Sequence, residues 1–77
     1  MDAELKKAKL AKLLETEGYD TIEALFTAVL SDVVSPAICT QAGCDYTTEM
    51  EPDQDAGYCE VCGTQTVVAA LVLADLI

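Results

Sequence analysis

The chain has 77 residues, a formal net charge of −10, three tyrosines, one phenylalanine and no tryptophan. This length allows one domain, with a core so small that a metal ion or disulfides are often needed to stabilise it. Hydrophobic residues make up 52% of the sequence, which excludes an intrinsically disordered chain. We therefore expect one small domain with a mainly aliphatic core.

The charges are divided unevenly along the chain. All four lysines lie within the first twelve positions, whereas residues 13–77 carry twelve carboxylates and no cation. Nucleic-acid binding depends mainly on Lys and Arg side chains that neutralise phosphates. A nucleic-acid partner is therefore not expected, and an acidic surface of this kind suits a basic protein partner better.

Targeting signals are not visible. The first fifteen residues contain no long apolar run and no small-residue cleavage site, so no signal peptide is predicted. The apolar segment 67–77 is too short to span a bilayer. We expect a cytoplasmic protein without a membrane partner. Paired cysteines in that reducing compartment more often bind metal or do redox chemistry than form structural disulfides.

Two amphipathic helices are predicted in the N-terminal part. Over 3–16, leucines and alanines recur at helical spacing while lysines fill the opposite side, and Gly18 fits a helix stop. Over 20–33, apolar residues follow at i, i+3, i+4, i+7, i+8 and i+11 from Ile22. Asp20 and Glu23 form a capping-box pattern at the start of this stretch, and Pro36 prevents the helix from continuing. We expect an antiparallel helical hairpin over 1–35.

Residues 36–77 have a different pattern. Residues 46–51 alternate as a strand does, 52–57 form a loop by composition, and 57–61 can return as the partner strand of an antiparallel hairpin. Val67 and Val68 would suit a strand, but the length and alanine content of the last segment favour a short apolar helix over 67–76, packed on the second helix. The predicted fold class is a small, metal-stapled α+β domain, with 1–35 and 36–77 forming one compact unit.

Four cysteines form two close pairs. Cys39 and Cys44 make a C-x4-C, and after fourteen residues Cys59 and Cys62 make a C-x2-C. Zinc prefers a tetrahedron of thiolates, and two tight turns can supply two ligands each. Gly63 fits such a turn because glycine accepts left-handed backbone conformations. The sequence therefore predicts one structural Zn²⁺ bound by these four cysteines, at a closed site without the open position of a catalytic zinc.

Other uses of the cysteines fit the sequence less well. A C-x2-C disulfide is strained and reducible, and the expected compartment is reducing. A thioredoxin-like redox pair lacks its βαβ context. Iron remains an alternative to zinc, because the segments CDY and CEVCG are similar to rubredoxin knuckles. Rubredoxins, however, shelter the iron with several rings, and this chain has two tyrosines nearby.

From Ile38 onward, the chain resembles a group of short, functionally uncharacterised zinc-ribbon proteins of bacteria and phages. The segments CDYT, EPDQDAGYCEVCGT and a terminal ALVLA carry the resemblance, which covers about half of the chain. It implies a zinc ribbon whose ligands are Cys39, Cys44, Cys59 and Cys62. It implies no particular biological role.

The sequence contains no catalytic constellation. It has no histidine and no glycine-rich phosphate loop, and its serines have no neighbouring base. A closed metal site and an acidic surface predict a non-enzymatic protein-interaction module that is a monomer and has an unknown protein partner, for which a basic surface is the electrostatic match. Two alternatives stay open: a rubredoxin-like iron electron-transfer protein, and an acidic nucleic-acid mimic or regulator.

Overall fold

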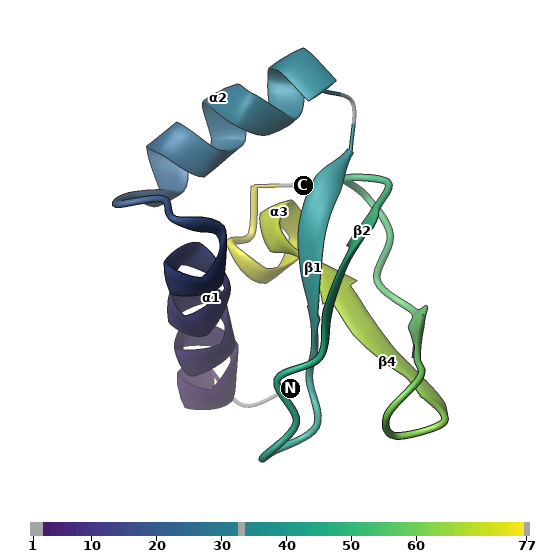
Figure 1. Ribbon diagram of the computed structural model, residues 1–77. Helices are drawn as coiled ribbons and strands as arrows, with labels where there is room; N and C mark the ends of the chain where they lie inside the picture. Colours follow the sequence, from purple (N-terminus) through teal and green to yellow (C-terminus); the bar gives the residue numbers. More distant parts are fainter. Residues whose placement is uncertain (1–2, 33, 77) are drawn as a thin grey trace.

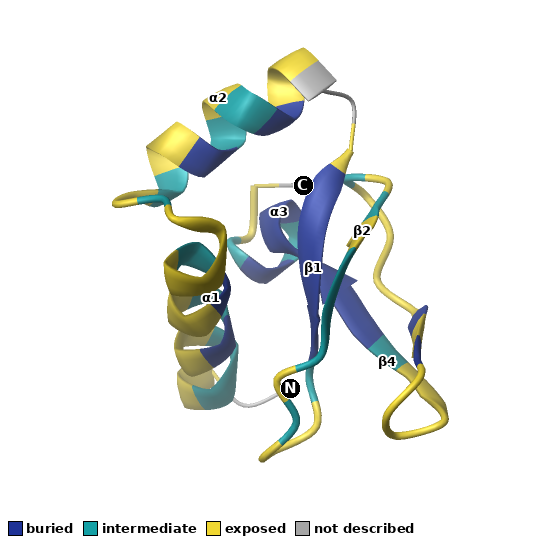
Figure 2. Ribbon diagram, in the orientation of Figure 1, coloured by how far each residue is buried: buried dark blue, intermediate teal, exposed yellow. Residues whose placement is uncertain are grey.

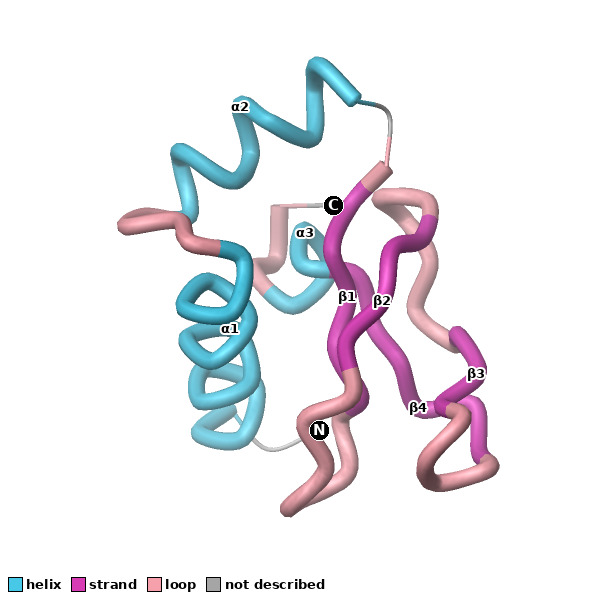
Figure 3. Tube along the Cα trace, viewed as in Figure 1, coloured by secondary structure: helices cyan, strands magenta, loops and turns pink. Residues whose placement is uncertain are grey.

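The computed structural model describes residues 3–32 and 34–76. The predicted units 1–35 and 36–77 also include Met1, Asp2, Val33 and Ile77, which lie outside the described residues. The helices are α1 (Ala3–Glu17), α2 (Ile22–Asp32) and α3 (Ala70–Leu73), and the strands are β1 (Ser35–Cys39), β2 (Thr47–Met50), β3 (Gly57–Cys59) and β4 (Thr64–Ala69). The four strands form one antiparallel sheet, which the helices cover from one side (Figures 1 and 3). This is an α+β fold, as predicted.

The sheet has a different strand pairing from the predicted one. The expected hairpin between 46–51 and 57–61 is wrong, because the strand order is β2-β1-β4-β3 and places β2 and β3 at opposite edges. β2 pairs with β1, and β3 pairs with β4. The sheet therefore consists of two hairpins that are joined where β1 pairs with β4.

Strand β1 is buried along its whole length, and the sequence did not predict it because Pro36 lies within it. The Cys39 N–H donates to the Tyr46 carbonyl at 2.9 Å. Since hydrogen-bonded and non-hydrogen-bonded pairs alternate in an antiparallel ladder, Pro36 and Glu49 form a pair of the second kind. On its other side, Pro36 lies beyond the end of β4. Its missing N–H therefore removes no bond from the sheet.

The C-terminal segment is divided between a strand and a short helix. The predicted helix over 67–76 is wrong for its first residues, because β4 continues to Ala69 and α3 covers only Ala70–Leu73. Val67 and Val68 are β-branched and pair with β1, which favours the extended conformation. α3 packs mainly against α1, β1 and β4, whereas packing on α2 was expected.

Strand β1, the C-terminal part of β4 and most of α3 are buried (Figure 2), and the two faces of the sheet bury different residues. Ile38 and Val68 face the helices, and the core on that side also contains Leu13, Leu25, Val29, Ala70, Leu71 and Leu73. Their neighbours Ala37, Cys39 and Val67 belong to a second cluster with Cys59. Because successive side chains of a strand point to opposite faces, β1 and β4 contribute to both clusters.

The two long helices lie close to the predicted ranges 3–16 and 20–33, but they do not have the predicted arrangement. In the apolar stripe of α2, Leu25 and Val29 are buried in the core and Ile22 and Phe26 pack beside it, whereas Leu30 is 69% exposed. Gly18, with φ +81°, ends α1 as expected. Thr21 rather than Asp20 caps α2, since its Oγ1 accepts a hydrogen bond from the Ala24 N–H at 3.2 Å. α2 lies across the end of α1 instead of antiparallel beside it (Figure 1).

Gly57 allows β3 to approach β2 closely. A Cβ at this position would overlap the Met50 Sδ and lie 3.2 Å from the Val67 Cβ. We expect Gly57→Ala to lower the free energy of unfolding by about 1–3 kcal/mol through overpacking, measured by urea denaturation. Adding Met50→Ala should recover part of this loss, because it removes the overlapping atoms. A double variant less stable than either single variant would contradict this explanation.

Candidate metal centre

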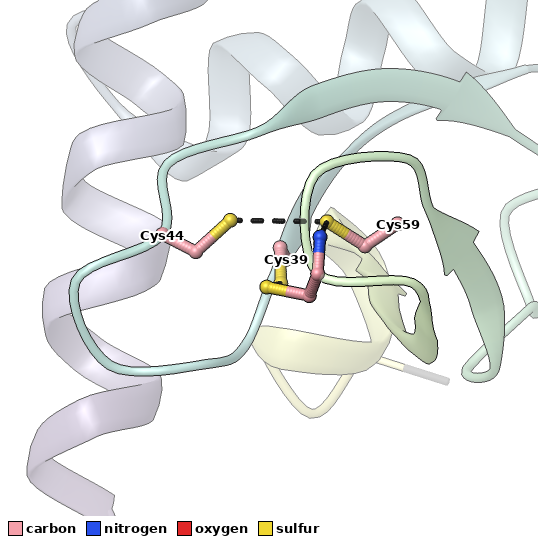
Figure 4. A group of neighbouring side chains, drawn as sticks. Cys39, Cys44 and Cys59 are labelled. Atoms are coloured by element: carbon pink, nitrogen blue, oxygen red, sulfur yellow. Dashed lines mark hydrogen bonds between the residues drawn. The ribbon is translucent and has the colours of Figure 1, made fainter.

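The four cysteines come from the connections of the two hairpins. Cys39 ends β1 and Cys44 lies in the loop that leads to β2, while Cys59 ends β3 and Cys62 lies in the turn before β4. Because β1 and β4 are neighbours, the two connections lie side by side and the thiols point toward one another (Figure 4). The structure thus brings together all four residues that the sequence singled out, through a strand pairing that the sequence did not predict.

The spacing of the sulfur atoms fits a tetrahedral metal site. All four Sγ atoms lie within 4.8 Å of one another. The Cys39–Cys62 and Cys44–Cys59 sulfur pairs are each separated by 3.8 Å. A tetrahedron with metal–sulfur bonds of about 2.3 Å has edges of about 3.8 Å, whereas a disulfide bond is about 2.05 Å long. The four thiols are free, and this cluster could bind a metal ion.

Hydrogen bonds in the turns orient the sulfur atoms. The Cys62 N–H donates to the Cys59 Sγ at 3.3 Å, and the Gly63 N–H donates to the Cys59 carbonyl at 2.8 Å. Gly63 has a φ of +71°, the left-handed conformation that the tight turn requires. On β4, the Thr66 Oγ1 lies 3.1 Å from the Cys39 Sγ. Contacts of this kind fix metal ligands and spread the charge of thiolates.

Lys9 is the residue of this site that the sequence did not predict. The lysines were expected on the solvated side of α1, but Lys9 is only 5% exposed, and its Nζ donates to the Cys44 carbonyl. Ala8 and Ala11, expected on the buried side, are exposed. Helical spacing alone could have indicated Lys9, since it lies four residues before the fully buried Leu13; its charge argued for the opposite side.

Lys9 also supplies a cation to a strongly acidic part of the molecule. Its Nζ lies 3.8 Å from the Asp45 Oδ1. Four thiolates and one divalent ion together carry a charge of about −2, and residues 13–77 contain no cation to offset it. Lys6 is paired with Asp75 at 2.6 Å instead. Lys9 therefore attaches α1 to the turn that holds Cys44, and it is positioned to offset the net negative charge that four thiolates and a divalent ion would carry.

The close packing of the thiols opposes the loss of all their protons. Burial raises the pKa of Cys39, but hydrogen bonds from the Thr66 hydroxyl and the Gln41 backbone outweigh it and lower this pKa to about 7. The contact with the Cys44 sulfur, together with burial and the nearby Cys39, raises the pKa of Cys62 to about 12. A cation bound among the sulfurs would remove this repulsion, so metal binding has to displace protons.

Replacing Lys9 with methionine tests its link to the cluster. Lys9→Met keeps the length of the side chain but removes the donor to Cys44 and the charge. We expect a free energy of unfolding that is lower by about 1–3 kcal/mol and weaker Zn²⁺ binding, measured by urea denaturation and by competition with a chelator. Lys12→Met, at an exposed position of the same helix, should change neither. Equal Zn²⁺ affinity in the two variants would show that Lys9 does not act on the site.

The affinity for Zn²⁺ should increase with pH. The raised pKa of Cys62, about 12, means that this thiol keeps its proton at neutral pH and that Zn²⁺ must displace it. Each displaced proton changes the apparent affinity about tenfold per pH unit, so we expect a loss of about a hundredfold or more from about pH 8 to about pH 6. Chelator competition at several pH values measures this. An affinity independent of pH over this interval would exclude thiol ligands.

Comparison with protein-family models, with curated proteins and with solved structures finds no match to this chain. The resemblance of residues 38–77 to short zinc-ribbon proteins therefore stays a prediction. Within residues 3–32 and 34–76, no helix is long and apolar enough to cross a membrane. The features of the molecule that indicate a function are therefore the four-sulfur cluster and the acidic surface.

Proposed function

We propose that this protein binds one structural Zn²⁺ through Cys39, Cys44, Cys59 and Cys62 and acts as a non-enzymatic protein-interaction module. The observation that supports the metal is the 3.8 Å separation in each of two sulfur pairs, which is the edge of a tetrahedral tetrathiolate site. An ion bound there would join the β1–β2 connection to the β3–β4 connection. Structural zinc contributes about 10–16 kcal/mol of apparent binding free energy, which is comparable to the entire stability of a typical domain.

The surroundings of the cluster favour zinc over iron. Of the two nearby tyrosines, Tyr46 packs against the cluster, whereas Tyr58 is 59% exposed. Cys62 is exposed as well. Rubredoxins shelter a reactive iron with several rings, and this site offers one packed ring. Zinc has no redox chemistry to protect, so the exposed sulfur is compatible with it.

The interaction role follows from the donor set and the charge. Four sulfur ligands leave no open coordination position for a substrate, and the chain contains no histidine that could act as a base. Outside α1 every charged side chain is a carboxylate. The partner that such a surface attracts is a basic polypeptide.

Metal analysis and binding measurements test the two parts of this proposal. Protein from cells supplied with both metals should contain one zinc per chain, and a chelator should abolish the β-sheet signal in circular dichroism, since the hairpins lose their common ligand. Zinc-loaded protein should retain basic polypeptides at low salt and release them as salt screens the charges. A red protein with one iron per chain would show that the site binds iron, and it would favour the electron-transfer function over the interaction module. Failure to retain any basic polypeptide at low salt would contradict the interaction role.

A further inference from the structure

A groove of about 550 Å³ lies between the two edge strands β2 and β3. The sheet curls so that Met50 of β2 reaches Gly57 of β3, and these two residues lie in the groove. The groove is also lined by Tyr46, Glu49, Glu51, Tyr58 and Glu60. None of the four cysteines lines this groove, although Tyr46 and Met50 also pack against the group that contains Cys39 and Cys59.

The chemistry of the groove suits cationic side chains. Three exposed glutamates, Glu49, Glu51 and Glu60, are among the residues that line it, and no lysine or arginine is. Because side chains alternate along β2, Glu49 lies on the opposite face of the strand from Tyr46 and Met50. The Tyr46 hydroxyl donates to the Glu60 Oε2 at 3.4 Å, so a ring and a carboxylate lie together. Cations bind over the faces of tyrosine rings, and the flexible Met50 thioether adapts to different side chains.

The backbone of β2 offers a second type of contact. β2 pairs with β1 on one side only. Since the Cys39 N–H donates to the Tyr46 carbonyl, the alternating ladder directs the N–H and C=O groups of Thr47 and Glu49 away from β1. No strand in the described part of the chain pairs with them. An open edge of this kind accepts an additional extended segment.

We propose that the groove binds an extended, lysine- or arginine-rich segment of a partner protein, which pairs with the free edge of β2. Because the side chains of an added strand also alternate, cationic side chains on one face of the segment lie near Tyr46, Tyr58 and Glu60, and those on the other face lie near Glu49. A second copy of this chain is a poor occupant of this edge, because its β2 would bring further glutamates, and no cation, to an edge that already carries Glu49 and Glu51. The lysines of the chain lie on helix α1 rather than on a strand. The proposal depends on the proposed interaction function and identifies its surface.

A short synthetic peptide of alternating lysine and threonine serves as the probe. We expect saturable binding to the purified protein at low salt, followed by fluorescence anisotropy, and changes in the NMR amide shifts of 47–50 and 57–60. The double variant Glu49→Gln/Glu51→Gln should bind about fivefold more weakly. The matched control Glu15→Gln/Glu17→Gln removes the same charge from exposed positions of α1 and should bind as the unchanged protein does. A peptide with methylated backbone nitrogens at alternate positions should bind about tenfold more weakly, because it cannot pair fully with the strand edge.

Four results would overturn the proposal. Equal weakening in the two double variants, or shift changes confined to another surface, would exclude this groove but leave a protein that binds basic polypeptides. Self-association through the amides of 47–50 without peptide, detected by sedimentation, would make a second copy the occupant. Absence of saturable binding to basic peptides at low salt would exclude both the groove and the interaction function.

Discussion

The antiparallel pairing of β1 with β4 is the interaction on which the rest of this structure depends. It joins two hairpins that are separate in sequence, and it brings the connection holding Cys39 and Cys44 next to the turn holding Cys59 and Cys62. The same pairing places Ile38 beside Val68 under the helices, where they form part of the main core. Hydrophobic burial under the helices therefore stabilises the same pair of strands that brings the four sulfur atoms together.

Helix α1 connects the two sides of the molecule. Leu13 packs in the core, and Lys9, one helical turn earlier, reaches the carbonyl of Cys44 at the edge of the sulfur cluster. The uneven charge distribution thus has a structural use, since one of the few cations lies next to the site where negative charge is concentrated. The remaining surface is acidic. Among the described residues that line the groove between β2 and β3, none is basic, so the glutamates there are not neutralised within the groove.

The elements whose signal is local could be predicted from the sequence. The α2 stripe and the Gly18 stop follow from helical spacing and backbone conformation, and the cysteine spacing indicated a common cluster. The strand pairing could not be predicted, because β1 and β4 are distant in sequence and each carries a misleading residue pattern. Pro36 argues against a strand and is tolerated only at a position that makes no ladder bond, while alanines near the end of β4 argue for a helix. The burial of Lys9 was missed because it depends on where α1 docks.

The alternation of side chains along β1 restricts how the length of this chain can vary. Ile38 and Cys39 are adjacent but point to opposite faces, so the insertion or deletion of one residue within the strand would turn the sulfur into the core and the isoleucine toward the cluster. Homologous chains should therefore keep the number of residues between Ser35 and Cys39.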